Sequence, residues 1–145
     1  MENISVFGGV ISIIASKTFP TGFTVTQFAD DSDPLSFSPI TIANVGMGVN
    51  GDMISWSSPA PVPVTINIIP GGVDNTNLQI LADANRVGQG RVGADDIIQM
   101  TVVYPDGQTV ILSNGKLTSD PVSAGMASSG RKTTRTYSFA FESKV

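Results

Sequence analysis

Three carboxylates lie close together near position 30. Asp30, Asp31 and Asp33 could offer oxygen ligands to a calcium ion. A calcium-binding EF-hand loop also needs a glycine at its bend and a distal glutamate, and this stretch has neither. The sequence therefore predicts a solvated polar turn, and we expect no metal and no cofactor.

Two stretches match the G-x-G-x-x-G pattern of dinucleotide-binding loops, Gly46–Gly51 and Gly88–Gly93. In a nucleotide site this pattern follows a strand and opens a helix, so that the pyrophosphate meets the helix amides. The first stretch lies inside a predicted hairpin and the second follows a predicted helix. Neither context suits a nucleotide, and we expect no such site.

Catalytic side chains are scarce. The chain of 145 residues has no histidine and no cysteine, which removes the commonest general base, the commonest transition-metal ligand and all thiol chemistry. A hydrolase with paired carboxylates stays open as a third alternative, because their separation in space is invisible in the sequence. We expect a protein that is not an enzyme.

The single tryptophan and a short basic cluster are the remaining candidates for recognition. Trp56 could be a sugar-stacking platform, an interface anchor, or a partly buried ring that closes the edge of a sheet. Arg131 and Arg135 are four residues apart on a predicted strand and so share a face. They could pair with the aspartates near position 30 of an adjacent copy, or form a solvated, charged strand edge.

One amphipathic helix is expected after residue 72. Its apolar stripe has helical spacing and consists of Leu78, Leu81, Ala82 and Asn85. Thr76 and Gln79 have the spacing of a capping box, and Asp74 is a competing N-cap. Gly88 is expected to end the helix, with Arg86 near the negative end of the dipole. So short a helix must pack on a sheet to be stable.

The rest of the chain has the pattern of strands and turns. Asn50-Gly51, Asp106-Gly107 and Asn114-Gly115 predict hairpin turns in which both residues have positive φ, and Phe19–Gly22 predicts another turn. The predicted strands are Ile4–Ala15, Phe23–Ala29, Ile40–Val49, Asp52–Ser57, Val62–Ile68, Ile97–Tyr104, Gln108–Ser113, Lys116–Thr118 and Lys132–Glu142. We expect a mainly β, antiparallel sandwich or barrel with one flanking helix, as a single domain over residues 1–145.

The chain carries little charge. Charged residues make up 14% of it, against about 25% in an average soluble domain, and the net charge is −4. Either hydroxyl groups keep the surface soluble or much of it is hidden against other copies. An acidic balance argues against a DNA-binding surface. No stretch reaches the length of a membrane span and Glu2 does not suit a signal peptide, so we expect no membrane and synthesis in the cytoplasm.

Taken together, these segments resemble the tail tube proteins of contractile-tailed bacteriophages over nearly the whole chain. The residues that carry the resemblance are, in order, Ile4–Phe7, Phe19–Phe23, Gln27–Pro34, Gly48–Asp52, Trp56-Ser57, Val64–Gly71, Ala84–Arg86, Tyr104–Gly107 and Tyr137–Glu142. Their order and spacing, more than any one of them, make the likeness specific.

The resemblance implies a small β-barrel or sandwich flanked by a helix, in six-membered rings that stack into a hollow tube inside a contractile sheath. It also implies a place in the virion, a lumen through which viral DNA passes without specific binding, and sheath, baseplate and tail terminator proteins as partners. It brings no catalytic residues. The alternatives are a tube protein of a related contractile injection system, and a carbohydrate-binding sandwich that uses Trp56, Tyr104 and Tyr137.

Contacts between subunits are expected at the loops over Asp30–Pro39 and Asp120–Gly130, which combine polar residues with apolar ones. The candidate inter-subunit contacts are Asp30, Asp31, Asp33, Leu35, Phe37, Trp56, Arg86, Arg131 and Arg135.

Overall fold

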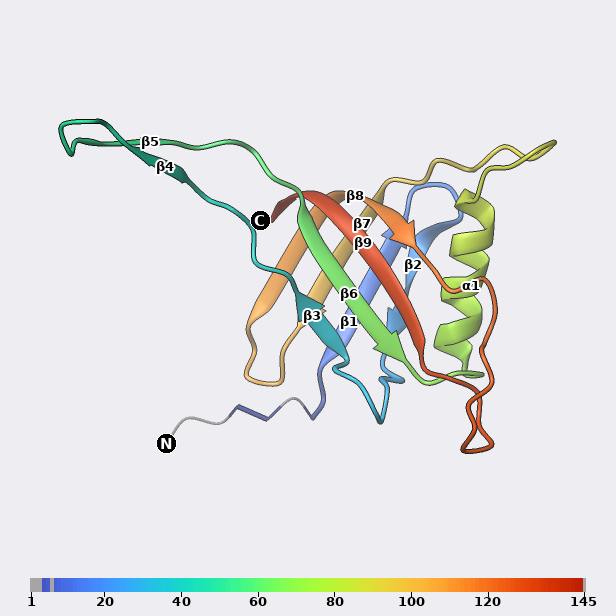
Figure 1. Ribbon diagram of the computed structural model, residues 1–145. Coiled ribbons are helices and arrows are strands. Elements are labelled where there is room, and N and C mark those ends of the chain that lie inside the picture. Colours follow the sequence, from blue (N-terminus) through green and yellow to red (C-terminus); the bar gives the residue numbers. More distant parts are fainter. Residues whose placement is uncertain (1–3, 6, 145) are drawn as a thin grey trace.

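The computed structural model describes residues 4–5 and 7–144, and the described part contains nine strands and one helix (Figure 1). The elements are β1 (Val10–Ala15), β2 (Phe19–Val25), β3 (Leu35–Phe37), β4 (Asn44–Met47), β5 (Met53–Trp56), β6 (Val62–Ile68), α1 (Val73–Asn85), β7 (Ile98–Val103), β8 (Thr109–Ser119) and β9 (Arg135–Lys144). Every strand pairing is antiparallel. The expected mainly β, antiparallel architecture with one flanking helix is confirmed.

Seven strands form one strongly curved sheet, in the order β2-β1-β7-β8-β9-β6-β3. The segment that follows β2 returns to the far side of this sheet and bonds to the end of β6. The amide of Ala29 donates to the carbonyl of Asn67 at 3.1 Å, and that of Ile69 donates to the carbonyl of Gln27 at 3.0 Å. The curved sheet is thereby closed on itself at this end, while β4 and β5 form a separate two-stranded sheet.

The inward faces of the strands and the helix stripe share one hydrophobic core. The three aromatic rings of β9, Tyr137, Phe139 and Phe141, are all buried and alternate with exposed or half-buried residues. Leu78, Leu81 and Ala82 of α1 belong to the same core, so the predicted helix stripe is confirmed except at Asn85, which is half-buried and binds Asp96 instead.

Two buried carboxylates fasten α1 beside the edge strand β2. At the start of the helix, Asp74 Oδ2 accepts hydrogen bonds from the amides of Thr26 and Gln27, both at 2.8 Å, just beyond the end of β2. Near the other end, the Asn85 side chain donates to Asp96 Oδ2 at 2.8 Å. Asp96 also binds the turn that precedes β2. The helix is therefore held at both ends of the same strand.

Asp96 has only 1% of its surface exposed, yet its charge is well compensated. Its Oδ1 accepts from the amides of Lys17 at 2.8 Å and Thr18 at 3.0 Å, and its Oδ2 accepts from the Thr18 hydroxyl. Burial raises the pKa of Asp96, but the hydrogen bonds from Thr18, Asn85 and Lys17 outweigh it, so the pKa lies below its ordinary value.

The strand β8 contains an unexpected bulge. Asn114-Gly115 does not turn the chain as predicted, because β8 continues through it, with Asn114 at a φ of 56°. The glycine at this position serves a long-range contact. A Cβ at Gly115 would lie 2.3 Å from Cδ1 of the Phe141 ring, so only glycine leaves room for this core aromatic. The predicted strands Gln108–Ser113 and Lys116–Thr118 are therefore one strand.

The two other Asx-Gly turns are hairpins, as predicted, but of another type. The amide of Gly51 donates to the carbonyl of Gly48 at 2.9 Å, and that of Gly107 to the carbonyl of Tyr104 at 3.0 Å. Positive φ occurs at these two glycines only, not at the residue before each. Both loops therefore combine an ordinary turn with a left-handed glycine, instead of the predicted pair of left-handed residues.

Several predicted boundaries are wrong. The first strand begins at Val10, with Ile4 and Phe7 exposed, and only one of its faces is fully buried. Phe19–Gly22 lies inside β2, and the chain turns at residues 16–18 instead. The helix begins at Val73 without a capping box, because the Thr76 hydroxyl donates back to the carbonyl of Gly72 at 3.1 Å.

Replacing Gly115 by alanine should destabilise the protein by about 1–3 kcal/mol, because the added methyl group overlaps the Phe141 ring. The measurement is the free energy of unfolding in urea. Gly88→Ala is the matched control, since a Cβ there meets no atom within 4 Å. Equal stability of the two variants would contradict the packing argument.

Asp96→Asn should reduce the free energy of unfolding at pH 7 by about 1–3 kcal/mol, because an amide cannot accept all of these hydrogen bonds. Since the pKa of Asp96 is lowered on folding, its contribution is complete above its unfolded pKa, near 3.8, and is lost as pH falls through the folded pKa. The difference from the unsubstituted protein should therefore shrink on acidification below pH 4. Asp52→Asn, at an exposed aspartate, is the control and should leave the free energy of unfolding at pH 7 unchanged.

Candidate functional site

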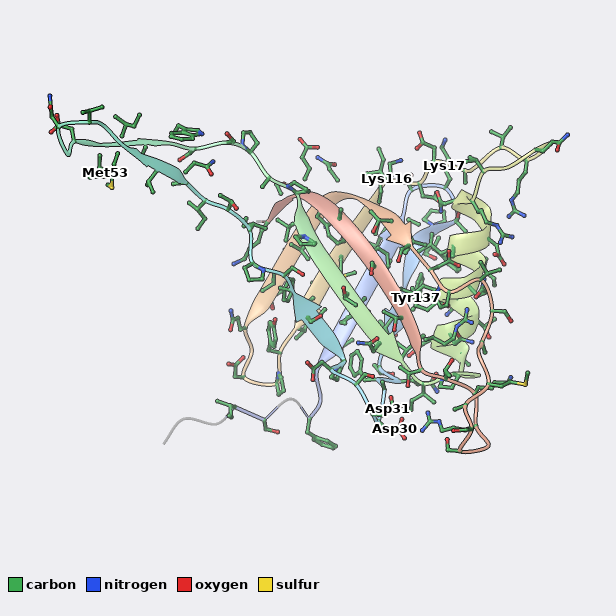
Figure 2. All side chains as sticks on the ribbon, in the orientation of Figure 1. Lys17, Asp30, Asp31, Met53, Lys116 and Tyr137 are labelled. Carbon is green, nitrogen blue, oxygen red and sulfur yellow. The ribbon has the colours of Figure 1, made fainter. Side chains whose placement is uncertain are left out.

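The strands β4 and β5 form a hairpin arm, residues 44–56, that projects from the body of the protein (Figures 1 and 2). Within the described residues the two strands pair only with each other, from Asn44 opposite Trp56 to Met47 opposite Met53. An isolated two-stranded hairpin is at best marginally stable in water. Strand pairing with the described body of the protein therefore adds nothing to the stability of the arm.

Both faces of the arm are apolar. Val45, Met47 and Met53 lie on one face, because Met47 and Met53 are directly paired and Val45 is two residues away. Ile54 and Trp56 lie on the other face, above Gly46, whose missing side chain leaves space under the two larger ones. Each of these five side chains has more than half of its surface exposed. Clustered exposure of this kind marks a contact surface.

The arm is also almost free of charge. Between positions 40 and 61 the one ionisable side chain is Asp52, near the hairpin turn. Such a surface suits an apolar protein partner and does not suit an ionic one. The sequence prediction included Trp56 as a candidate contact but missed Val45, Met47, Met53 and Ile54. The signal that could have revealed them is apolar residues at both odd and even positions around a hairpin turn.

The acidic turn near position 30 binds the loop that precedes β9 in the same chain. Arg131 Nη1 donates to Asp30 Oδ2 at 2.9 Å, and the Thr134 hydroxyl donates to Asp31 Oδ1. The hydrogen bond from Arg131 lowers the pKa of Asp30 below its ordinary value. Arg131 and Asp30 thus pair within one chain, and the pairing with an adjacent copy stays a prediction. The remaining acid of the turn, Asp33, is exposed.

The predicted contact loop over Asp30–Pro39 is partly a strand. Leu35 pairs with Ile66 and Phe37 with Val64, so both residues belong to β3 at one end of the sheet. The backbone carbonyl of Asp33 accepts a hydrogen bond from the Asn67 side chain at 2.7 Å. Only part of each side chain is covered, and Phe37 keeps 40% of its surface exposed.

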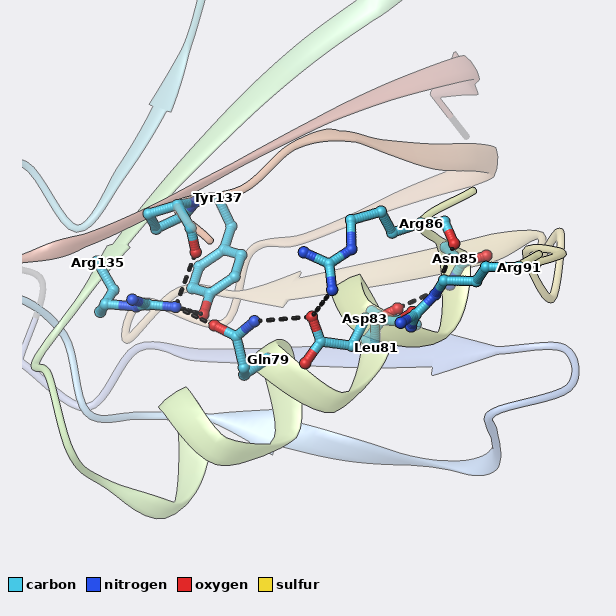
Figure 3. Close-up of polar contacts among 9 residues, drawn as sticks. Gln79, Leu81, Asp83, Asn85, Arg86, Arg91, Arg135 and Tyr137 are labelled. Atoms are coloured by element: carbon cyan, nitrogen blue, oxygen red, sulfur yellow. Dashed lines mark hydrogen bonds and ion pairs between the residues drawn. The ribbon is translucent and has the colours of Figure 1, made fainter. Parts of the chain in front are cut away.

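Arg135 is not a surface residue, although it was predicted to share a face with Arg131. It has 2% of its surface exposed and donates to the carbonyl of Pro121 at 3.0 Å, to the Tyr137 hydroxyl at 3.2 Å and to Gln79 Oε1 (Figure 3). Gln79 in turn donates to Asp83 at 3.1 Å. In this conformation Arg135 links α1 to β9 inside the molecule.

Arg86 ends the same row of polar groups on the helix. Its guanidinium lies 3.5 Å from Asp83 Oδ1, with both side chains about two-fifths exposed. Arg91 donates to the carbonyls of Asp83 and Arg86, which satisfies groups left free where the helix ends. Arg86 thus stays available at the surface, unlike Arg135.

The structure does not bring the candidate residues into one site. Trp56 lies on the arm, and Asp30 and Asp31 lie at another end of the molecule, as Figure 2 shows by the positions of Met53 and these two aspartates. The proposed sugar platform of Trp56, Tyr104 and Tyr137 is not formed, because Tyr137 is buried in the core. Burial also raises its pKa.

Among the described residues, no group of three or more acidic, histidine or cysteine side chains is arranged to hold a metal ion. The one helix of this part of the chain, α1, is not long and apolar enough to cross a bilayer.

Replacing residues 44–56 by a short Gly-Ser linker should change the free energy of unfolding by no more than about 1 kcal/mol, because the arm adds only a loop to the body. Urea denaturation, monitored by circular dichroism, would measure this change in the free energy of unfolding. Replacing residues 35–37 by the same linker is the control, and it should destabilise the body since β3 pairs with β6. A large loss on removing the arm would show that it packs on the body.

The fold has a known counterpart. It matches a chain of the structure entitled "Cryo-EM Structure of an Extracellular Contractile Injection System, PVC sheath-tube complex in extended state", with a TM-score of 0.54, 15% sequence identity, and coverage of 99% of this chain and 90% of that chain. No curated protein sequence matches. The model of the family described as "Tail fiber protein gp32" matches residues 2–145. The chain therefore belongs to the tail fiber protein gp32 family, a group of phage tail proteins.

Proposed function

We propose that the protein is the subunit of the tail tube of a contractile phage tail, and that it has a structural and not a catalytic role. Copies assemble into hexameric rings, and the rings stack into a hollow conduit for DNA. The observation that carries the proposal is the arm, a projecting hairpin that is apolar on both faces. The fold shared with a chain of a sheath-tube complex supports it.

The partners and place of the protein follow from this role. In the assembled virion the tube lies inside the sheath and meets the baseplate and the tail terminator protein at its ends. Its net charge of −4 suits a conduit, because an acidic wall repels DNA phosphates instead of holding them.

A tail fibre subunit is the second candidate, because the family is described by that name. A tube of a related contractile injection system is a variant of the first proposal and would use the same contacts. The position of the protein in the virion distinguishes the two candidates. An antibody against a tube subunit should label the sheathed tail along its length, and an antibody against a fibre subunit should label the periphery of the tail.

Purified protein at high concentration should form hollow tubes of constant diameter, visible by negative-stain electron microscopy. Met53→Asp should raise the concentration needed for assembly at least tenfold, because it places a charge on an apolar face of the arm.

Ile80→Asp is the matched control, since Ile80 is an exposed apolar residue of α1, outside the arm. A protein that stays monomeric at every concentration and is absent from phage tails would refute the proposed function.

A further inference from the structure

An apolar pocket opens at one end of the curved sheet, between β1, β3 and β7. Its cavity of about 170 Å³ is lined mainly by Val10, Phe28, Leu35, Phe37, Val103 and Tyr104. None of the described residues that line it is charged. A cavity of this size and polarity suits one large apolar side chain and not a polar ligand.

The arm of the same chain lies away from this pocket. The pocket is at the end of the sheet where the turn Tyr104–Gln108 joins β7 to β8, and the arm leaves the body at the opposite end and points outward (Figure 1). An arm that reaches the pocket must therefore come from another molecule.

We infer that the pocket between β1, β3 and β7 receives Trp56 from the arm of a second copy. This inference rests on the proposed function and names the surface that the arm binds. Trp56 is the largest side chain of the arm, is 52% exposed and lies on an uncharged face beside Ile54. Tryptophan is one of the residues most enriched at the binding hot spots of interfaces, which cluster in well-packed, desolvated pockets.

The charges around the pocket argue against other partners. Asp33 and Asp106 are the chain neighbours of Pro34 and Pro105, which line the pocket. Phosphate groups of lipids or nucleic acids would be repelled at this acidic rim. The Trp56 face of the arm brings no charge with it, because Asp52 lies at the hairpin turn.

The contact has a direct consequence for assembly. Arm and pocket are different surfaces at opposite ends of one molecule, so each copy donates one arm and receives another. A head-to-tail contact of this kind does not saturate in a dimer. It forms a ring where the rotation between copies closes, and an open polymer where it does not.

The single tryptophan and the absence of cysteine make the contact measurable. One variant carries Trp56→Phe and Asp106→Cys, and its cysteine, at the pocket rim, is labelled with a nitroxide. A small fraction of this variant is mixed with unlabelled copies that retain Trp56. On assembly, the label should quench the tryptophan fluorescence of neighbouring copies. The same label on Ile80→Cys, in the same Trp56→Phe background, should quench much less.

A second variant tests the pocket without a label. Phe37→Asp places a charge at the pocket mouth, and it should raise the concentration needed for assembly at least tenfold, while Ile80→Asp should not. Circular dichroism checks that the variant is folded. If the variant does not fold, the quenching experiment still tests the pocket.

Three results would overturn the inference. Tubes that form with no more quenching from the pocket rim than from position 80 would exclude the pocket as the site of Trp56, and the proposed function would stand. If Phe7→Asp, near the pocket in sequence, impaired assembly while quenching was absent, the occupant would be the N-terminal segment. A failure of unlabelled protein to assemble would overturn both proposals together.

Discussion

Two buried carboxylates, Asp74 and Asp96, hold the helix against the edge of the sheet, and the arrangement of the molecule depends on them. Strand β2 is the last strand on its side of the sheet, and such an edge offers free amides and carbonyls to any other strand. The helix lies beside that edge and is fastened at both ends of it by charge-assisted hydrogen bonds. Association by edge pairing is thus restricted here, and the available contact surface lies elsewhere.

The body and the arm differ sharply in how far their apolar side chains are buried and their polar groups are hydrogen-bonded. In the body, apolar residues from the sheet and the helix form one core, and the buried carboxylate of Asp96 accepts hydrogen bonds from its neighbours. Arg135 Nη2 also donates within the chain, while its buried Nε has no partner among the described residues. The arm has none of this support, because its two strands bond only to each other. Burying its large apolar side chains on assembly would yield about 1.5–3 kcal/mol for each one fully buried.

Local patterns in the sequence predicted what local forces determine. The strand at β9 and three of the four stripe residues of α1 were predicted correctly, because burial on one side of a strand or helix repeats with its period. Asn114-Gly115 was misread as a turn, since the Phe141 ring that needs the space at Gly115 is distant in sequence. Asp74 was predicted as a possible N-cap because its actual partners, the amides of Thr26 and Gln27, are almost fifty residues away in the sequence.

The two apolar faces of the arm constrain how copies can meet. A flat partner covers one face of a hairpin and leaves the other in water, so an arm with Met47 and Met53 on one face and Trp56 on the other requires two partner surfaces. A single flat contact would therefore leave either the two methionines or Trp56 in water, and both faces are covered only where the arm lies between two surfaces.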